Sequence, residues 1–211
     1  MIAVKARGQC KTRLARVLDA PGRIRLAREM LHHVLLAVRA AHRVDAVLVV
    51  SPERDTLPGD VALVHDAGDG LNQAFVVACR HAAAAGAGPL LLLPADLPAL
   101  LPADVDAVVA AGEATGVAIA PDRAGTGTNA LYLARPGGFP LAFGPLSRRA
   151  HACAARARGD NPRTVERPGL LDDLDTAEDY LARRARAAAE DSTTPDQEVA
   201  WHHARAHWTA C

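Results

Sequence analysis

The sequence predicts a single α/β domain, with a mostly parallel β-sheet covered by helices on both faces in three layers. Short apolar runs alternate along the chain with longer stretches of helical periodicity. Hydrophobic residues make up 50% of the 211 residues, which is enough for one well-buried core. Aromatic residues make up only 3%, so small aliphatic side chains must fill that core, as is typical of a helix-covered parallel sheet.

The expected strands are short apolar runs that end at turn-forming residues. Ser51-Pro52 ends the second run and Pro94 ends the fourth. The fourth run consists of leucines alone, so we expect it to be a central strand that is covered on both faces. The strands are expected at residues 2–4, 46–50, 61–64, 90–93, 117–120 and 130–133.

The expected helices show apolar residues at intervals of three and four. In the first of them, a stripe of this kind runs from Ala27 to Val38. Gly86 and Gly159 end two of the others, and Thr176 with Asp179 has the spacing of a capping box at the start of the last. The helices are expected at residues 22–41, 72–85, 103–111, 147–158 and 176–189.

The composition becomes polar after residue 189, so we expect one folded domain at residues 1–189 and a polar linker with a tail at residues 190–211. The tail contains Trp201 and Trp208, which favour an amphipathic segment that docks on the domain or on a second subunit. The spacing of His203 and His207 on a helix would also permit a metal site, which we consider the weaker interpretation.

Charge and cysteine usage exclude several classes of protein. The formal net charge is +0, which argues against a nucleic-acid-binding protein. The four cysteines form no C-x-x-C pair and indicate reduced thiols in a cytoplasmic protein. The longest apolar run, residues 89–95, is too short to span a membrane. Basic residues nevertheless dominate residues 1–28, which suggests a small polyanion such as a triphosphate as ligand, although a solvated helix face is the preferred interpretation for most of these arginines.

The first loop expected to carry chemistry is residues 5–14, between the first strand and a helix start. Backbone amides at a helix N-terminus bind phosphate groups, and Lys5, Lys11 and Arg13 add positive charge to this loop. A triphosphate requires both features. A basic surface loop without a ligand is the alternative.

Acidic residues follow the most buried strand and precede the last helix. Asp96 lies directly after the leucine run, where a carboxylate is costly unless it binds a cation or hydrogen-bond donors. Mg²⁺ held by one or two carboxylates and by nucleotide phosphates fits this position. Helix capping explains Glu178 and Asp179. It explains Asp173 and Asp175 less well, and their x-D-x-D spacing favours a metal-binding role.

The segment 125–130 superficially matches the dinucleotide fingerprint G-x-G-x-x-A. That fingerprint must follow a strand and open a helix, whereas here a strand follows, so we exclude NAD binding. Its glycines allow close approach of an anion, and Thr126, Thr128 and Asn129 supply neutral donors. A flexible hairpin-like turn is the alternative.

With these loops in order, the chain resembles the 2-phospho-L-lactate guanylyltransferase family, which acts in the synthesis of coenzyme F-420. The resemblance extends over residues 1–181 and implies a Rossmann-like fold of the molybdopterin-guanine-transferase and glycosyltransferase-A type. The motifs that carry it are Lys5 to Leu14, Gly70-Leu71-Asn72, Pro94 to Pro98, Gly127 to Leu131, Phe143 to Ser147 with His151, and Asp173 to Thr176.

The resemblance implies a role for each matching residue. Lys5, Lys11 and Arg13 would bind the triphosphate of GTP, and Gly70, Leu71 and Asn72 would line the base and ribose region. Asp96 and Asp175, with Asp173 beside them, would hold Mg²⁺. The phosphate of the acceptor would be bound by Thr128, Gly144 and Ser147, with Asn129 alongside. The implied acceptors are 2-phospho-L-lactate, phosphoenolpyruvate and 3-phosphoglycerate.

The expected reaction is attack of the acceptor's phosphate on the α-phosphorus of GTP with release of pyrophosphate, for which no general base is needed. His151 would then serve in helix packing or in substrate orientation. Two other functions remain open: a metal-dependent glycosyltransferase of the same fold, and a nucleotide-binding protein without activity. A homodimer is the assembly that we consider.

Overall fold

The computed structural model describes residues 1–6, 11–55 and 57–191, and these residues form a seven-stranded sheet with the order β3-β2-β1-β4-β6-β5-β7. The strands are β1 (Ile2–Ala3), β2 (Leu48–Ser51), β3 (Ala62–His65), β4 (Leu90–Pro94), β5 (Val117–Ala120), β6 (Ala130–Leu133) and β7 (Arg163–Thr164). The helices are the 3-10 turn η2 (Thr12–Leu14), α1 (Ala20–Ala40), α2 (Leu71–Ala84), α3 (Pro102–Thr115), α4 (Ser147–Ala157), α5 (Pro168–Leu171) and α6 (Ala177–Asp191).

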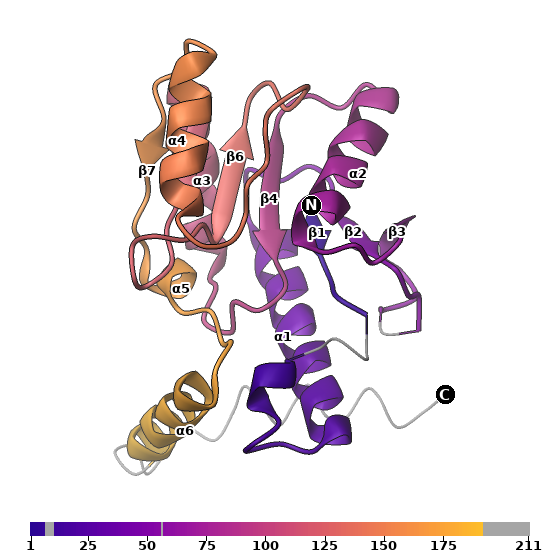
Figure 1. Ribbon diagram of the computed structural model, residues 1–211, viewed down its shortest axis with the longest axis vertical. Helices are drawn as coiled ribbons and strands as arrows, with labels where there is room; N and C mark the ends of the chain where they lie inside the picture. Colours follow the sequence, from indigo (N-terminus) through magenta and orange to yellow (C-terminus); the bar gives the residue numbers. More distant parts are fainter. Residues whose placement is uncertain (7–10, 56, 192–211) are drawn as a thin grey trace.

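Helices cover both faces of the sheet and make the three layers that the sequence predicts (Figure 1). One hydrophobic core joins α1 and α3 to the face on which Ile2 lies. The other joins α2 and α4 to the face on which Ala3 lies. These two neighbours in β1 enter opposite cores because successive side chains of a strand point to opposite faces. A third, smaller core packs Leu14 and Leu174 against α1 and α6.

Strand β6 runs antiparallel to both of its neighbours, β4 and β5, whereas the other pairs are parallel. The segment that leads into β6 therefore starts at the same edge at which β1, β4 and β5 end. This direction brings residues 121–129 to the edge of the sheet at which β1 and β4 end. The hairpin-like connection weighed for this segment is what the structure shows, since Gly125 donates from its amide to the carbonyl of Asp122 at 2.9 Å.

Each predicted strand and helix is present, with shifts of a few residues at the ends. The first helix begins two residues before the predicted start, because the side chain of Asp19 caps it by accepting from the amide of Gly22 at 2.8 Å. The capping box predicted at the last helix is confirmed: Asp179 accepts from the amide of Thr176 at 2.7 Å, and the hydroxyl of Thr176 accepts from the amide of Asp179 at 3.2 Å. The sequence did not predict η2, β7 or α5.

The last helix continues to Asp191, two residues beyond the boundary that the sequence predicts. The remainder of the predicted linker and tail, with Trp201, Trp208, His203 and His207, lies outside the described residues. Over residues 1–6, 11–55 and 57–191, none of the helices has the length and apolar character needed to cross a membrane.

Helix α5 is fixed against the loop before α3 by close packing at Gly169. A Cβ atom at this position would overlap Asp104 Oδ2 and lie 2.5 Å from the carbonyl oxygen of Ala99. Asp104 is buried and accepts from Arg167 Nε at 2.9 Å, so neither contact can easily give way. A side chain at position 169 would therefore require α5 or the loop before α3 to shift.

We expect Gly169→Ala to lower the free energy of unfolding by about 2–4 kcal/mol, as overpacking in a tight site does. The matched control is Gly137→Ala, because a Cβ there meets no atom within 4 Å. Urea denaturation of both variants measures the difference. Equal stability of the two variants would contradict the packing described for α5.

Candidate active site

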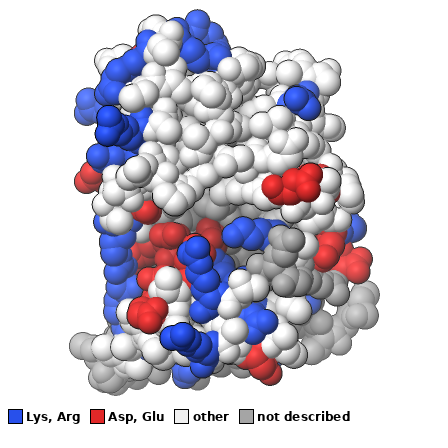
Figure 2. Space-filling model, viewed as in Figure 1, with Lys and Arg blue, Asp and Glu red and all other residues white. Residues whose placement is uncertain are grey.

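Three segments meet at the carboxyl edge of the sheet: the segment after β1, the segment after β4 and the segment between α5 and α6. The amide of Leu174 donates to the carbonyl of Asp96 at 3.2 Å and joins the second of these segments to the third. In the space-filling view, acidic and basic side chains gather together across the lower half of the face shown, below a mostly uncharged region (Figure 2). Charge of both signs is thus concentrated at this edge.

Lys11 lies between two of the predicted carboxylates. Its Nζ atom donates to Asp96 Oδ2 and to Asp175 Oδ1, at 2.7 Å in each case. The side chain of Lys11 is only 9% exposed, and its backbone is in the left-handed region with φ 49°. A lysine rarely adopts this conformation, which costs about 1–3 kcal/mol and is typical of functional sites. The fold thus holds one ammonium group between two acids that come from different segments.

The charges in this cluster shift one another's pKa values. Burial opposes the charged form of Lys11, but the adjacent carboxylates of Asp96 and Asp175 outweigh it and raise its pKa. Burial likewise opposes ionisation of Asp175. The charge and hydrogen bond of Lys11 outweigh this, with further help from Lys5 and Arg13, so the pKa of Asp175 is lowered. Lys11 and Asp175 therefore both carry their charges at neutral pH.

Asp173 lies two residues from Asp175 and is partly buried. Burial raises its pKa, and the negative charge of Asp96 raises it further, while a hydrogen bond from Asn129 opposes the rise. Asn129 Nδ2 donates to Asp173 Oδ1 at 3.4 Å and to the carbonyl of Leu170 at 2.8 Å. A positive charge that reached this cluster would favour ionisation of Asp173. The side-chain amide of Asn129 thereby joins the start of β6 to the acidic segment.

A second, less charged cluster surrounds the start of α4. Thr128, directly before Asn129, places its Oγ1 atom 3.1 Å from Nδ1 of His151. His151 is fully buried, and burial lowers its pKa to about 4, so the ring is neutral at pH 7. The hydroxyl of Ser147 is also buried, and it has no hydrogen-bond partner within the described part of the chain. Two buried hydroxyl groups, those of Thr128 and Ser147, therefore lie in this second cluster.

The loop before α4 is fastened to the start of α2. Asn72 Oδ1 accepts from the amide of Phe143 at 2.6 Å, and Asn72 Nδ2 donates to the carbonyl of Phe143 at 2.9 Å. Gly70 precedes α2 with φ 99°, a conformation that favours glycine. The ring of Phe143 packs between those of Phe75 and His151, at 4.8 and 4.9 Å between centroids. These contacts connect two of the motifs found in the sequence, residues 70–72 and residues 143–147 with His151.

Comparison with known proteins identifies the family. Residues 1–182 match the model of the family described as "Guanylyl transferase CofC like". The phosphoenolpyruvate guanylyltransferase of Rubrobacter xylanophilus is 45% identical over 87% of this chain and 91% of its own length. That of Sphaerobacter thermophilus is 39% identical over 85% and 88%. The chain belongs to the CofC-like guanylyl transferase family.

A solved structure shares the fold at lower identity. A nucleotidyl transferase from Methanothermobacter superposes with a TM-score of 0.61 at 21% identity, and the match covers 88% of this chain and 94% of that one. Together with the family match, this confirms the three-layer α/β fold and the resemblance found in the sequence. The CofC-like chain is a nucleotidyltransferase of the guanylyl-transferring kind. A glycosyltransferase and a protein without activity are not favoured.

The structure brings together many, but not all, of the residues predicted for the CofC-like site. Lys11, Asp96 and Asp175 are in direct contact, and the charges of Lys5 and Arg13 act on Asp175. Arg13 Nη1 lies 3.9 Å from Asp175 Oδ2 and its side chain is 73% exposed. Residues 7–10 of the predicted phosphate loop lie outside the described residues.

Several predicted residues also have structural partners that the sequence did not reveal. The side-chain amide of Asn72 is hydrogen-bonded to the backbone of Phe143. The side-chain amide of Asn129 is hydrogen-bonded to the carbonyl of Leu170 and to the carboxylate of Asp173. The backbone amide of Ser147 donates to the carbonyl of Gly144 at 3.1 Å, which leaves its side-chain hydroxyl as the remaining donor. No motif could have indicated the partners of Asn72 and Asn129, because these partners are distant in the sequence.

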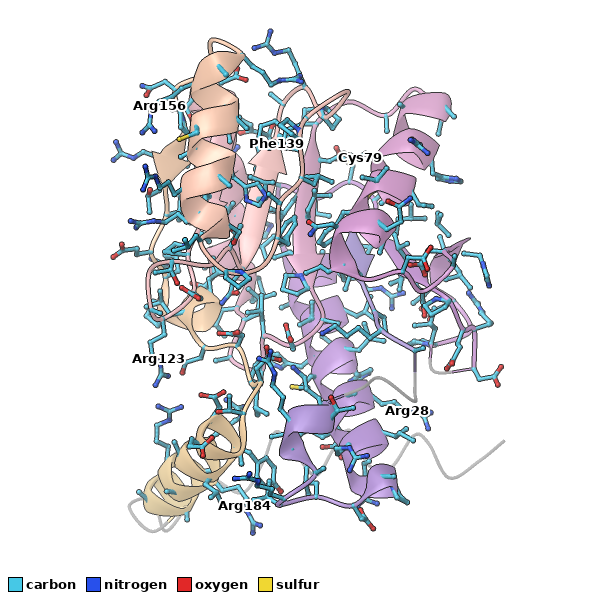
Figure 3. The ribbon with its side chains drawn as sticks, in the orientation of Figure 1. Arg28, Cys79, Arg123, Phe139, Arg156 and Arg184 are labelled. Carbon is cyan, nitrogen blue, oxygen red and sulfur yellow. The ribbon has the colours of Figure 1, made fainter. Side chains whose placement is uncertain are left out.

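The acidic segment also contains an exposed pair outside the cluster. Asp172 accepts from the guanidinium of Arg123 and lies 3.4 Å from Nη2 of Arg186. Arg123 lies between α5 and α6 in the side-chain view (Figure 3). Because these groups are partly exposed, the pair is expected to contribute at most about 1 kcal/mol to stability. Asp172 therefore differs in role from Asp173 and Asp175, although all three belong to one acidic run.

The carboxylates fit a divalent cation that arrives together with a nucleotide. Asp96 and Asp175 already share one cationic atom at 2.7 Å, and carboxylate oxygens are ligands that Mg²⁺ prefers. Within the described residues there is no group of three or more histidine, cysteine, aspartate or glutamate side chains placed to hold a metal alone. Phosphate oxygens and water would have to complete the coordination, which is the usual arrangement for Mg²⁺.

Proposed function

We propose that this protein transfers GMP from GTP to phosphoenolpyruvate, releases pyrophosphate, and acts in the cytoplasm in the synthesis of coenzyme F-420. The convergence of Lys11, Asp96 and Asp175 at the carboxyl edge of the sheet is the observation that carries the proposal. Phosphoenolpyruvate is favoured among the three expected acids because the two curated relatives described above are named for it. The relatives' names support this choice, and a direct assay must test it.

In this proposal the positive groups bind the nucleotide. Lys5, Lys11 and Arg13 bind the triphosphate, while residues 70–72 line the base and ribose region. Asp96 and Asp175, assisted by Asp173, hold Mg²⁺, which neutralises charge on the phosphates when bound. Positive groups placed beside the transferred phosphoryl group stabilise the charge that develops in the transition state.

The acceptor lies on the other side of the reacting phosphorus. Thr128, Gly144 and Ser147 bind the phosphate of phosphoenolpyruvate, with Asn129 alongside. An oxygen of that phosphate forms a bond to the α-phosphorus of GTP, and the bond from the α-phosphorus to the bridging oxygen of the β-phosphate breaks. Pyrophosphate takes the electron pair and leaves. The acceptor is ionised at neutral pH, so the protein needs no general base, in keeping with the pKa of about 4 that makes His151 a weak base.

Incubation with GTP, Mg²⁺ and one acid at a time, followed by mass spectrometry, tests this proposal. We expect phosphoenolpyruvate to give a guanosine-diphosphate-linked product and an equal amount of pyrophosphate, with a kcat/KM at least tenfold above those of 2-phospho-L-lactate and 3-phosphoglycerate. Pyruvate, which lacks the phosphate, is the matched control and should give no product. Consumption of a UDP-sugar without consumption of GTP would contradict the proposal.

The proposal also includes a cytoplasmic location and a homodimeric assembly. Cys79 and Cys153 are free thiols in the structure, in keeping with a reducing compartment. The homodimer stays a prediction, which measurement of the mass in solution would test.

A further inference from the structure

The two nitrogens of the buried His151 ring have different hydrogen-bond roles. The amide of Ala142 lies 3.0 Å from Nε2 and can only donate, so Nε2 must accept and carries no proton. A neutral imidazole then has its proton on Nδ1. Nδ1 lies 3.1 Å from Thr128 Oγ1, so the ring donates to that hydroxyl oxygen. The backbone of Ala142 thus selects the tautomer of His151.

This tautomer determines what the hydroxyl of Thr128 can do. A hydroxyl group has one proton to donate and two lone pairs that accept. Because one lone pair of Thr128 Oγ1 accepts from His151, its proton must point elsewhere. Within residues 1–6, 11–55 and 57–191, His151 is the hydrogen-bond partner found for this hydroxyl, and no acceptor for its proton is found. Thr128 is therefore set to donate to something that is not part of the described chain.

The surroundings of His151 keep this arrangement rigid. The ring of Phe143 meets that of His151 edge-on, at 4.9 Å between centroids, and the ring of Phe139 lies at 6.1 Å. His151 has no exposed surface, and burial favours its neutral state. A rotation of the ring would break both hydrogen bonds at once. The hydroxyl of Ser147, four residues earlier in the chain, has no partner among the residues that the structure describes and provides a second donor in the same region.

We propose that His151 is a positioning residue for the acceptor, because its Nδ1–H bond to Thr128 directs the hydroxyl proton of Thr128 toward the acceptor's phosphate. This inference rests on the proposed function, which places Thr128 at the acceptor. A fully ionised phosphate can only accept hydrogen bonds, so it needs a hydroxyl whose proton points toward it. If His151 served only to pack α4, its replacement would affect the binding of GTP and of the acceptor alike. In the proposed role, its replacement affects the binding of the acceptor alone.

Two near-isosteric variants separate the two contacts of His151. His151→Gln places an oxygen near the former Nε2 position and can still accept from Ala142, but it loses the donor to Thr128. His151→Asn places an amide near the former Nδ1 position and can still donate to Thr128. We expect His151→Gln to raise the KM for phosphoenolpyruvate about ten- to hundredfold while the KM for GTP changes less than twofold. His151→Asn should retain more of the acceptor affinity than His151→Gln.

The Thr128 hydroxyl provides the second arm of the experiment. In Thr128→Val the hydroxyl is absent, so adding His151→Gln should raise the acceptor KM no further. Arg149→Ala, an exposed position on the same helix, is the matched control and should leave both KM values unchanged. The inference is overturned if His151→Gln raises both KM values equally, or if it lowers stability without changing the acceptor KM.

A spectroscopic measurement addresses the tautomer without any assay. Long-range proton–nitrogen NMR spectra of the ¹⁵N-labelled full chain should show His151 with its proton on Nδ1, and a proton on Nε2 would overturn the inference. This outcome is separate from the proposed function. If the unmodified protein makes no guanylylated product, the proposed function fails; if it is active but the two histidine variants behave alike, only the role of His151 fails.

Discussion

Lys11→Met is expected to lower kcat/KM for GTP by about a thousandfold and, in the absence of nucleotide, to raise the affinity of the protein for Mn²⁺ at least tenfold. The first effect follows because the ammonium group is proposed to bind the triphosphate, and such charged contacts contribute several kcal/mol in the transition state. The second follows because Lys11 Nζ lies 2.7 Å from both Asp96 and Asp175, between the carboxylates that a divalent cation would bridge.

The two effects have opposite signs, which distinguishes this prediction from simple damage to the fold. Without Lys11 the two carboxylates repel each other, and a divalent cation relieves that repulsion. Titration of Mn²⁺ followed by electron paramagnetic resonance measures the affinity, and a steady-state assay measures turnover. The control is Arg16→Met, which removes a charge from an exposed position close to Lys11 in the sequence. Unchanged Mn²⁺ affinity in Lys11→Met would show that the lysine does not occupy the metal's position.

The same lysine implies an order of binding. Lys11 neutralises the carboxylates of Asp96 and Asp175, with which it is in direct contact. A metal ion that enters without nucleotide would have to displace the lysine, so it would bind weakly. A triphosphate offers Lys11 another anion and offers the metal its phosphate oxygens. We therefore expect GTP to increase the Mn²⁺ affinity of the unmodified protein, and to increase it much less in Lys11→Met.

Much of the fold can be predicted from the sequence because local patterns of apolar residues indicate which strands and helix faces are buried. The leucine run at residues 90–93 became the central strand β4, and the apolar stripe on the first helix became its buried face. The strand β7 could not be predicted, since Arg163 and Thr164 are both exposed and polar. Its place in the sheet is determined by pairing with β5, which no local pattern reveals. The direction of β6 was likewise hidden, because it depends on the path of the preceding loop.

In the candidate site, too, only part could be predicted from the sequence. The charged residues could be predicted individually, because strand ends of an open α/β sheet meet at one edge. Their partners could not, since Lys11 contacts acids that are 85 and 164 residues away in the sequence. The pairing of Thr128 with His151 was also hidden, because a histidine in a helix more often packs than orients a ligand. Its meaning depends on the amide of Ala142, which only the folded chain places beside the ring.

Asp96→Asn is expected to lower kcat by at least a thousandfold while leaving the protein folded. Asparagine retains the shape and one oxygen of aspartate but not its charge, so the variant tests charge and not geometry. The backbone carbonyl of Asp96, which accepts from Leu174, is unaffected by the substitution, so the segment that carries Asp173 and Asp175 should stay in place. Lys11 also retains Asp175 as its partner.

Asp172→Asn is the matched control, because it removes a charge from the same acidic run without touching Lys11. Asp172 pairs with Arg123 and Arg186 at the surface, so this variant should keep its turnover and lose at most about 1 kcal/mol of stability. For both variants, steady-state assays measure turnover, thermal unfolding measures stability, and a fluorescent GTP analogue measures nucleotide binding. If Asp96→Asn turned over at the rate of Asp172→Asn, the charge of Asp96 would have no part in the reaction, and Asp173 and Asp175 would have to hold the metal instead.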